Sequence, residues 1–188
     1  MNPDLEGASI MIVDDTPANL ELLAEMLHAK GYRVLQFPNG MTALHACVRV
    51  KPDLILLDIM MPQMDGFEVN RRLKTDEKLR DIPVIFISAL DDTANIVQAL
   101  SQGGVDYITK PFKEEEVLAR VRTHLKIVFL QRQLKAHNEN LEELVAKRTQ
   151  QLTRAHERLK ELDRLKDDFL SMISHEIRPP AHGLLGVG

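Results

Sequence analysis

The sequence predicts an α/β domain, a doubly wound sheet of five parallel strands, followed by one long coiled-coil helix. Residues 8–124 alternate short apolar runs with stretches in which apolar residues recur every three or four positions, as expected when helices cover both faces of a parallel sheet. From residue 113 onward there is no proline before Pro179 and no glycine before Gly183, while leucine keeps a three-and-four spacing. We therefore expect a domain over residues 8–124 and a coiled-coil helix over residues 125–168.

The elements of the domain follow from the order of these patterns. We expect strands at residues 9–13, 33–37, 53–57, 84–88 and 106–108. We expect helices at residues 17–30, 41–50, 67–75 and 93–102. Proline is tolerated in a first helical turn, so Pro17 begins the first helix with Thr16 as its expected N-cap.

The long helix carries a heptad-like seam of mostly apolar residues. The seam consists of Leu130, Leu134, His137, Leu141, Leu144, Arg148, Leu152, Ala155, Leu159 and Leu162.

 The steps along the seam alternate between three and four residues. The exception is two consecutive steps of four, from Leu144 through Arg148 to Leu152, which form a stutter. A periodic stretch of roughly 58 Å from Leu130 to Phe169 is too long for an ordinary surface helix, so we expect a parallel coiled-coil homodimer. A single helix that folds back on the domain is the alternative.

Composition and charge exclude several classes of protein. Of the 188 residues, 44% are apolar and 28% charged, as in a soluble globular protein, and the single cysteine, Cys47, permits no disulfide within the chain. The N-terminus lacks a secretory signal and no apolar run is long enough to span a membrane, so we expect a cytoplasmic protein. Residues 1–124 hold 19 acidic and 13 basic side chains, a net charge of −6, and residues 125–188 hold 9 and 11. We expect no binding to nucleic acid.

Three acidic residues are expected at the carboxyl ends of neighbouring strands. Asp14 and Asp15 follow the first strand and Asp58 follows the third, and these strands are adjacent in a sheet of order 2-1-3-4-5. Taken alone, an Asp-Asp pair after a strand is also typical of a turn and helix cap. Three carboxylates in one crevice repel each other unless a cation neutralises them, and an all-oxygen set of ligands suits Mg²⁺.

A hydroxyl and an ammonium group are expected at the same crevice. Ser88 ends the fourth strand, and Lys110 follows the fifth, although by itself Lys110 could be an ordinary surface lysine. A carboxylate nucleophile, a metal ion, a hydroxyl and a lysine together are the groups required for phosphoryl transfer to aspartate.

Four separated motifs in this order resemble the response-regulator receiver family over essentially all of residues 8–124: they read IMIVDD, LILLDIMMPQMDG, VIFISA and GVDYITKPF. The resemblance implies a flavodoxin-like fold and phosphorylation of Asp58 by a histidine kinase or phosphotransfer protein. It implies Mg²⁺ bound by Asp15, Asp58 and the backbone carbonyl of Met60, with Asp14 in the outer shell. It further implies that Ser88 and Lys110 contact the phosphoryl group. The resemblance also implies that Tyr107 swings inward when Ser88 moves.

A second resemblance lies at the end of the long helix. The string FLSMISHEIRPP resembles the H-box of histidine kinases, which implies that His175 accepts phosphate from ATP and that Glu176 assists as a base. Lys147-Arg148-Thr149 is similar to the signature of signalling helices that connect receivers to kinases. Residues 169–188 are thus expected to begin a truncated kinase dimerisation helix.

Two features depart from that second family. Pro179 replaces the usual threonine or asparagine, which puts phosphatase activity in doubt, and with Pro180 it predicts a helix kink near His175. Nothing in the chain resembles the ATP-binding kinase domain, so we expect no autokinase activity from this chain alone.

The leading functional hypothesis is a regulatory segment of a hybrid histidine kinase, in which phosphorylation of Asp58 changes how a dimeric coiled coil presents His175. The alternative is a non-enzymatic, phosphorylation-switched dimerisation or adaptor module. A Mg²⁺-dependent phosphatase of the haloacid-dehalogenase type is disfavoured, because that site has two aspartates one residue apart and here Asp14 and Asp15 are adjacent.

Overall fold

The computed structural model describes residues 7–89 and 101–176, except for the side chains of residues 175 and 176. The chain divides into two compact units, residues 1–133 and residues 134–188. We call the described part of the first the globular unit, and residues 134–176 of the second the helical arm.

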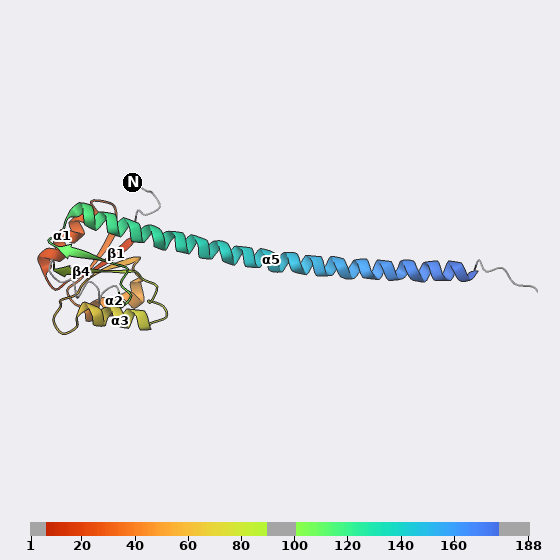
Figure 1. The fold of residues 1–188 in the computed structure, drawn as a ribbon, viewed down its shortest axis with the longest axis horizontal. Coiled ribbons are helices and arrows are strands. Elements are labelled where there is room, and N and C mark those ends of the chain that lie inside the picture. Colours follow the sequence, from red (N-terminus) through yellow and green to blue (C-terminus); the bar gives the residue numbers. More distant parts are fainter. Residues whose placement is uncertain (1–6, 90–100, 177–188) are drawn as a thin grey trace, which may run out of the picture. The chain divides into compact units, whose positions relative to one another are not determined.

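The globular unit contains the predicted five-stranded parallel sheet, in the order β2-β1-β3-β4-β5 (Figure 1). Its strands are β1 (Ser9–Val13), β2 (Arg33–Phe37), β3 (Leu54–Asp58), β4 (Val84–Ala89) and β5 (Asp106–Lys110). The first two strands have the predicted bounds. The other three differ at their ends, because Asp53 uses its carboxylate to accept hydrogen bonds from Ser9 just before β3, and because Ala89 of β4 pairs with Lys110 of β5.

The helices begin close to the predicted residues. They are α1 (Pro17–His28), α2 (Gly40–Val50), α3 (Gly66–Thr75) and α5 (Glu114–Glu176). Thr16 occupies the N-cap position of α1, but its side chain makes no capping hydrogen bond. α1 ends two residues earlier than predicted, because Lys30 and Gly31 form tight turn hydrogen bonds to Leu27 and His28. Residues 93–100 of the expected fourth helix lie outside the described residues.

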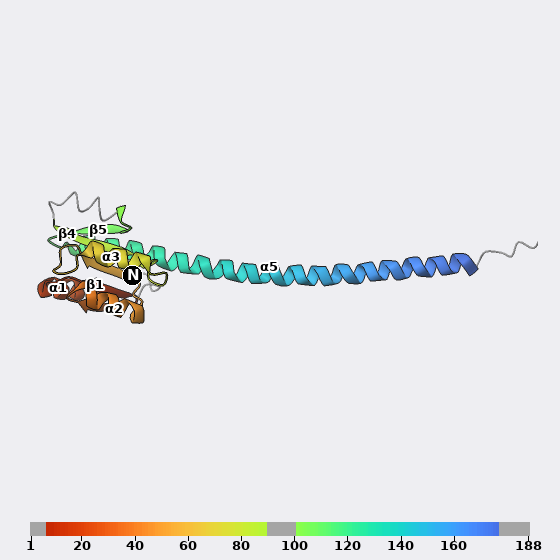
Figure 2. The same ribbon diagram turned by 90° about the horizontal axis from the view of Figure 1, so that it is seen from below.

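Two apolar clusters sandwich the sheet. On one face, Ile10 and Ile12 of β1 pack with α1 and with the first turns of α5, including Val121. On the other face, Met11 and Val13 pack with α2 and α3. Figures 1 and 2 show these helix pairs on opposite faces of the sheet. The alternation of side chains along β1 therefore fills both layers of the core.

The predicted long helix is confirmed as α5, which has 63 residues without a break in its helical backbone. Its apolar residues beyond Gln133 are largely exposed, and the coiled-coil dimer remains a prediction. The kink expected near His175 stays a prediction, because Pro179 and Pro180, which would cause it, lie outside the described residues. Among the described helices, none is long and apolar enough to cross a membrane.

Candidate functional site

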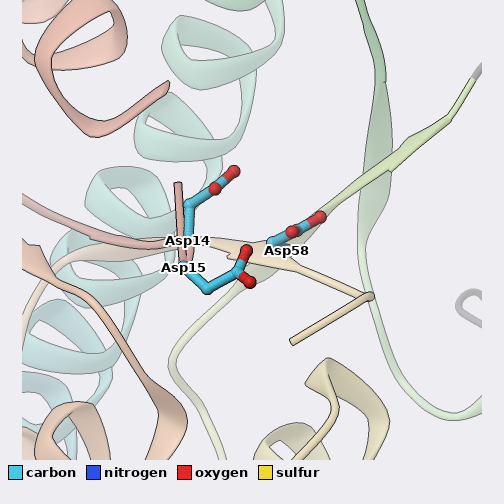
Figure 3. A group of neighbouring side chains, drawn as sticks. All are labelled: Asp14, Asp15 and Asp58. Atoms are coloured by element: carbon cyan, nitrogen blue, oxygen red, sulfur yellow. The ribbon is translucent and has the colours of Figure 1, made fainter. Parts of the chain in front are cut away.

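The carboxyl ends of β1 and β3 bring three carboxylates together, as the sequence predicted. Oxygen atoms of Asp14, Asp15 and Asp58 all lie within 4.8 Å of one another. Figure 3 shows their side chains projecting from the ends of the two neighbouring strands. The cause is the parallel register, which pairs Val13 with Leu57 and so places the next residue of each strand at the same edge.

The three carboxylates differ in their exposure to solvent. Asp14 is fully buried and Asp58 is only 3% exposed, whereas Asp15 is exposed. Asp15 therefore lies on the solvent side of the cluster, and Asp58 is buried at the carboxyl end of β3. A cation or a phosphate group approaching from solvent would meet Asp15 and then Asp58.

Lys110 reaches the cluster from the end of β5. Its Nζ lies 2.9 Å from Oδ2 of Asp14 and 3.1 Å from Oδ1 of Asp58. The side chain is 28% exposed, so the ion pairs are shielded but solvent retains access to the ammonium group. The peptide bond between Lys110 and Pro111 is cis.

These contacts shift the pKa values of both partners. Burial raises the pKa of Asp58 to about 6, and the charges of Asp14 and Asp15 add to the shift while Lys110 opposes it. Burial lowers the pKa of Lys110, but its hydrogen bonds and ion pairs with Asp14 and Asp58 outweigh this effect, and the net pKa is raised. One lysine thus leaves the three-carboxylate cluster under-neutralised, which favours binding of a further cation.

The donor set fits a magnesium ion. Carboxylate oxygens are the ligands that Mg²⁺ prefers, and Asp15 and Asp58 each offer one within 4.8 Å of the other. The oxygens of Asp14 already accept hydrogen bonds from the Thr16 backbone and from the Asn19 amide, at 2.9 Å and 3.0 Å, besides the ion pair with Lys110. This engagement suits Asp14 to the outer position expected from the sequence.

Ser88 is the penultimate residue of β4, the strand that pairs with β3. Asp58 pairs with Ile87 across the two strands, so Ser88 is one residue beyond that pair. Its side chain is buried, and its hydroxyl donates a hydrogen bond to the Ala89 carbonyl at 3.3 Å. A phosphoryl oxygen at the crevice would offer this hydroxyl a stronger acceptor.

Tyr107 lies in β5 and Met60 in the loop after β3, and the roles expected of them remain predictions. Tyr107 pairs with Phe86 in the sheet and is partly buried against the α2 and α3 face of the core. The guanidinium carbon of Arg120 lies 5.3 Å from the centre of the Tyr107 ring. Met60 lies in the loop after β3, where its side chain is 70% exposed.

Two residues of the site were missed by the sequence analysis. Asn19 lies in the first turn of α1 and orients Asp14, and only its spacing of five residues from Asp14 could have signalled this role. Gly66 begins α3 against β3, where an added Cβ would lie 2.3 Å from the Asp58 backbone carbonyl oxygen. The glycine allows α3 to start directly beside the end of β3.

His175 and Glu176 lie in the last turn of α5, in the helical arm. Their backbone is helical, and their expected roles remain predictions.

Comparison with protein-family models matches residues 10–122 to the response regulator receiver domain. The chain is 44% identical over 117 residues to the DNA-binding dual master transcriptional regulator RpaA of Synechocystis, a match that covers 62% of this chain and 48% of RpaA. It is 32% identical over 191 residues to hybrid signal transduction histidine kinase D of Dictyostelium discoideum, which covers 94% of this chain and 12% of that kinase. The chain thus spans about half of one relative and a small part of the other.

Among solved structures, the signal receiver domain of a signal transduction histidine kinase from Syntrophus aciditrophicus superposes with a TM-score of 0.60 at 38% identity. The match covers 64% of this chain and 91% of that domain.

Proposed function

The chain belongs to the response regulator receiver domain family, and we propose that it is a phosphorylation switch whose acceptor is Asp58. The observation that carries the proposal is the cluster of Asp14, Asp15 and Asp58 with the Lys110 ammonium group between two of its members. The phosphodonor is a histidine kinase or a phosphotransfer protein.

The proposed reaction is an attack by one oxygen of the Asp58 carboxylate on phosphorus. The new bond from oxygen to phosphorus forms as the bond from phosphorus to the donor's histidine nitrogen breaks, and the imidazole leaves. Lys110 stabilises the negative charge on the phosphoryl oxygens, and the Ser88 hydroxyl donates a hydrogen bond to one of them.

A magnesium ion would be held by Asp15, Asp58 and the Met60 backbone carbonyl, and it would supply charge neutralisation for the incoming phosphoryl group. Asn19 and the Thr16 amide hold Asp14, so that its carboxylate keeps Lys110 in place while facing the ion's outer shell.

The state of Asp58 would be passed on through the edge of the sheet. Movement of the Ser88 hydroxyl toward the phosphoryl group gives up its contact with Ala89, and Tyr107 turns inward beside it. Arg120 of α5 contacts the Tyr107 ring and pairs with Asp106, so this rearrangement reaches the start of the long helix.

The helical arm would be the output of the switch, as a parallel coiled-coil dimer. Its leucines, such as Leu152 at 71% exposed and Leu159 at 67%, find no partner in the described part of this chain. Similarity to a hybrid histidine kinase over 94% of the chain supports the extension of the proposal to the arm. In that reading the dimer controls the presentation of His175 to an ATP-binding kinase domain.

Acetyl phosphate provides the test of phosphorylation. Incubation of the chain with acetyl phosphate and Mg²⁺, followed by intact-mass measurement, should show the addition of one phosphoryl group. Asp58→Asn should show none, and the exposed Asp167→Asn should behave as the wild type. Equal uptake by the wild type and Asp58→Asn would overturn the proposal.

A non-enzymatic adaptor is the second candidate, because the exposed leucines of the arm would suffice for phosphorylation-controlled dimerisation without any role for His175. His175→Gln, made in the full-length protein, separates the two functions. Loss of phosphotransfer supports the kinase segment, and intact signalling supports the adaptor.

A further inference from the structure

The helical arm carries two overlapping apolar stripes in its first half. Leu134 and Leu141 belong to both, and they are 61% and 46% exposed. Leu144 and Val145 then lie next to each other, 50% and 63% exposed, and either one can continue the stripe. The same choice arises one heptad earlier, between His137 and Asn138, which are both exposed.

The first stripe, which we call the stuttered seam, runs through Leu134, His137, Leu141 and Leu144. Its spacing is three, four and three, but from Leu144 it reaches Leu152 only by two steps of four through Arg148. The second, the continuous seam, runs through Leu134, Asn138, Leu141 and Val145. It reaches Arg148 and Leu152 by steps of three and four, so its heptad is unbroken from Leu134 onward, and Leu130 lies outside it.

We propose that the dimeric arm has two alternative packings, one through each seam, and that the two exchange by rotation of the first half of the helix. The inference rests on the coiled-coil dimer of the proposed function, and adds which side chains are buried in each state. Four residues exceed one turn of a coiled coil by half a residue, so the rotation is on the order of 50°. Beyond Leu152 both packings use the same residues, and the rotation is absorbed around Arg148.

The two packings are close in stability because each contains defects that the other lacks. The stuttered seam buries the larger Leu144 but includes His137 and the interruption at Arg148. The continuous seam has regular spacing and the β-branched Val145, but it includes Asn138. A polar asparagine at such a position costs stability and is tolerated in two-stranded parallel coiled coils.

Charges on the flanks of the seam fit a second copy of this chain as the occupant. In a parallel dimer the residue at a flanking position contacts the residue five places later on the other helix. Arg158 then meets Asp163 of the second copy in both packings. In the continuous packing His137 leaves the seam and meets Glu142 of the second copy, so the exchange also changes the charge contacts.

Disulfide cross-linking of the full chain distinguishes the packings. Leu144→Cys reports the stuttered seam and Val145→Cys the continuous one, because a cysteine in the seam faces its own copy across the dimer. The wild type is the control, since its single cysteine, Cys47, is buried. Each reporter is combined with His137→Leu, which favours the stuttered seam, or with Asn138→Leu, which favours the continuous one.

The expected result is a ratio of cross-linking at 144 to cross-linking at 145 that differs by about tenfold or more between the two leucine variants, on oxidation with copper phenanthroline. An unchanged ratio in a chain that light scattering shows to be dimeric would overturn the two packings and leave the dimer intact. A monomer by light scattering would overturn the dimer itself.

Discussion

The globular unit buries its large apolar side chains, whereas the helical arm exposes them. Leu57 of β3 is 0% exposed and Leu152 of the arm is 71% exposed. One lysine in each region shows the same contrast, because Lys110 pairs with two buried carboxylates and Lys166 pairs with Asp163 at an exposed site. The first unit has a core of its own, while we expect the second to be stabilised by burial of its leucines in the proposed dimer.

Replacement of one leucine in each region gives the largest expected contrast. Leu57→Ala should lower the free energy of unfolding of the globular unit by about 2–5 kcal/mol, because it leaves a cavity in a close-packed core. Leu152→Ala should leave this value unchanged and weaken dimerisation. Tyrosine fluorescence during urea unfolding measures the first quantity, since both tyrosines, Tyr32 and Tyr107, belong to the globular unit. Light scattering over a range of concentrations measures the second.

If Leu152→Ala destabilised the globular unit as much as Leu57→Ala does, the leucine would be buried against that unit. The coiled-coil dimer would then be wrong, and the helix would fold back on its own domain.

Replacement of the two lysines compares a site charge with a surface charge. Lys110→Met should slow phosphoryl uptake from acetyl phosphate by about 10²–10³-fold, because it removes the ammonium group that stabilises charge on the phosphoryl oxygens. Lys166→Met should leave the rate unchanged. Intact-mass measurement of samples quenched at successive times gives both rates. A rate for Lys110→Met within a few-fold of the wild type would show that Lys110 does not take part in phosphoryl transfer.

The sequence predicted the strands from local patterns, and the common strand order of doubly wound sheets then predicted the acidic cluster. Apolar runs that end in Asp14, Asp15 and Asp58 specify the strand ends, and parallel topology brings those ends together. The roles of Asn19 and Gly66 were not predicted, since each depends on a contact between elements. A polar residue in a helix or a glycine at its start looks ordinary until the neighbouring strand is placed beside it.

The ends of the later strands show the same limit. Lys110 is a strand residue because Ala89 pairs with it, and its own side chain gives no indication of a strand. The sequence pattern of the helical arm also does not identify the surface that would cover its apolar face. Periodicity predicts that a face is buried, and Leu144 and Val145 show that it can predict two faces at once.

Acidification offers a smaller contrast, between Asp58 and an exposed aspartate. The pKa of Asp58 is raised to about 6 from an ordinary value of 3.8, so ionisation of this group opposes folding. Its cost is fully present above pH 6 and disappears as the pH falls through 6 toward 4. In the absence of Mg²⁺, Asp58→Asn should therefore raise the free energy of unfolding by on the order of 2–3 kcal/mol at pH 7.5 and have little effect near pH 4.

Asp167→Asn, at a site that is 70% exposed, is the matched control and should change stability little at either pH. Comparison with the wild type at each pH is needed, because Asp53 and Asp106 have lowered pKa values and lose their stabilising effect on further acidification. A difference between Asp58→Asn and wild type that does not depend on pH would contradict the raised pKa of Asp58.

The smallest expected effect concerns the last residues of α5 that belong to the globular unit. Arg132 pairs with Asp53 at 2.6 Å, but the Arg132 side chain is 64% exposed, so Arg132→Ala should cost less than about 1 kcal/mol. Asp53→Ala should cost more, about 1–3 kcal/mol, because it also removes the acceptor for the Ser9 amide and hydroxyl. Urea unfolding followed by tyrosine fluorescence measures both. Equal losses in the free energy of unfolding for the two variants would mean that Asp53 stabilises the unit mainly through Arg132.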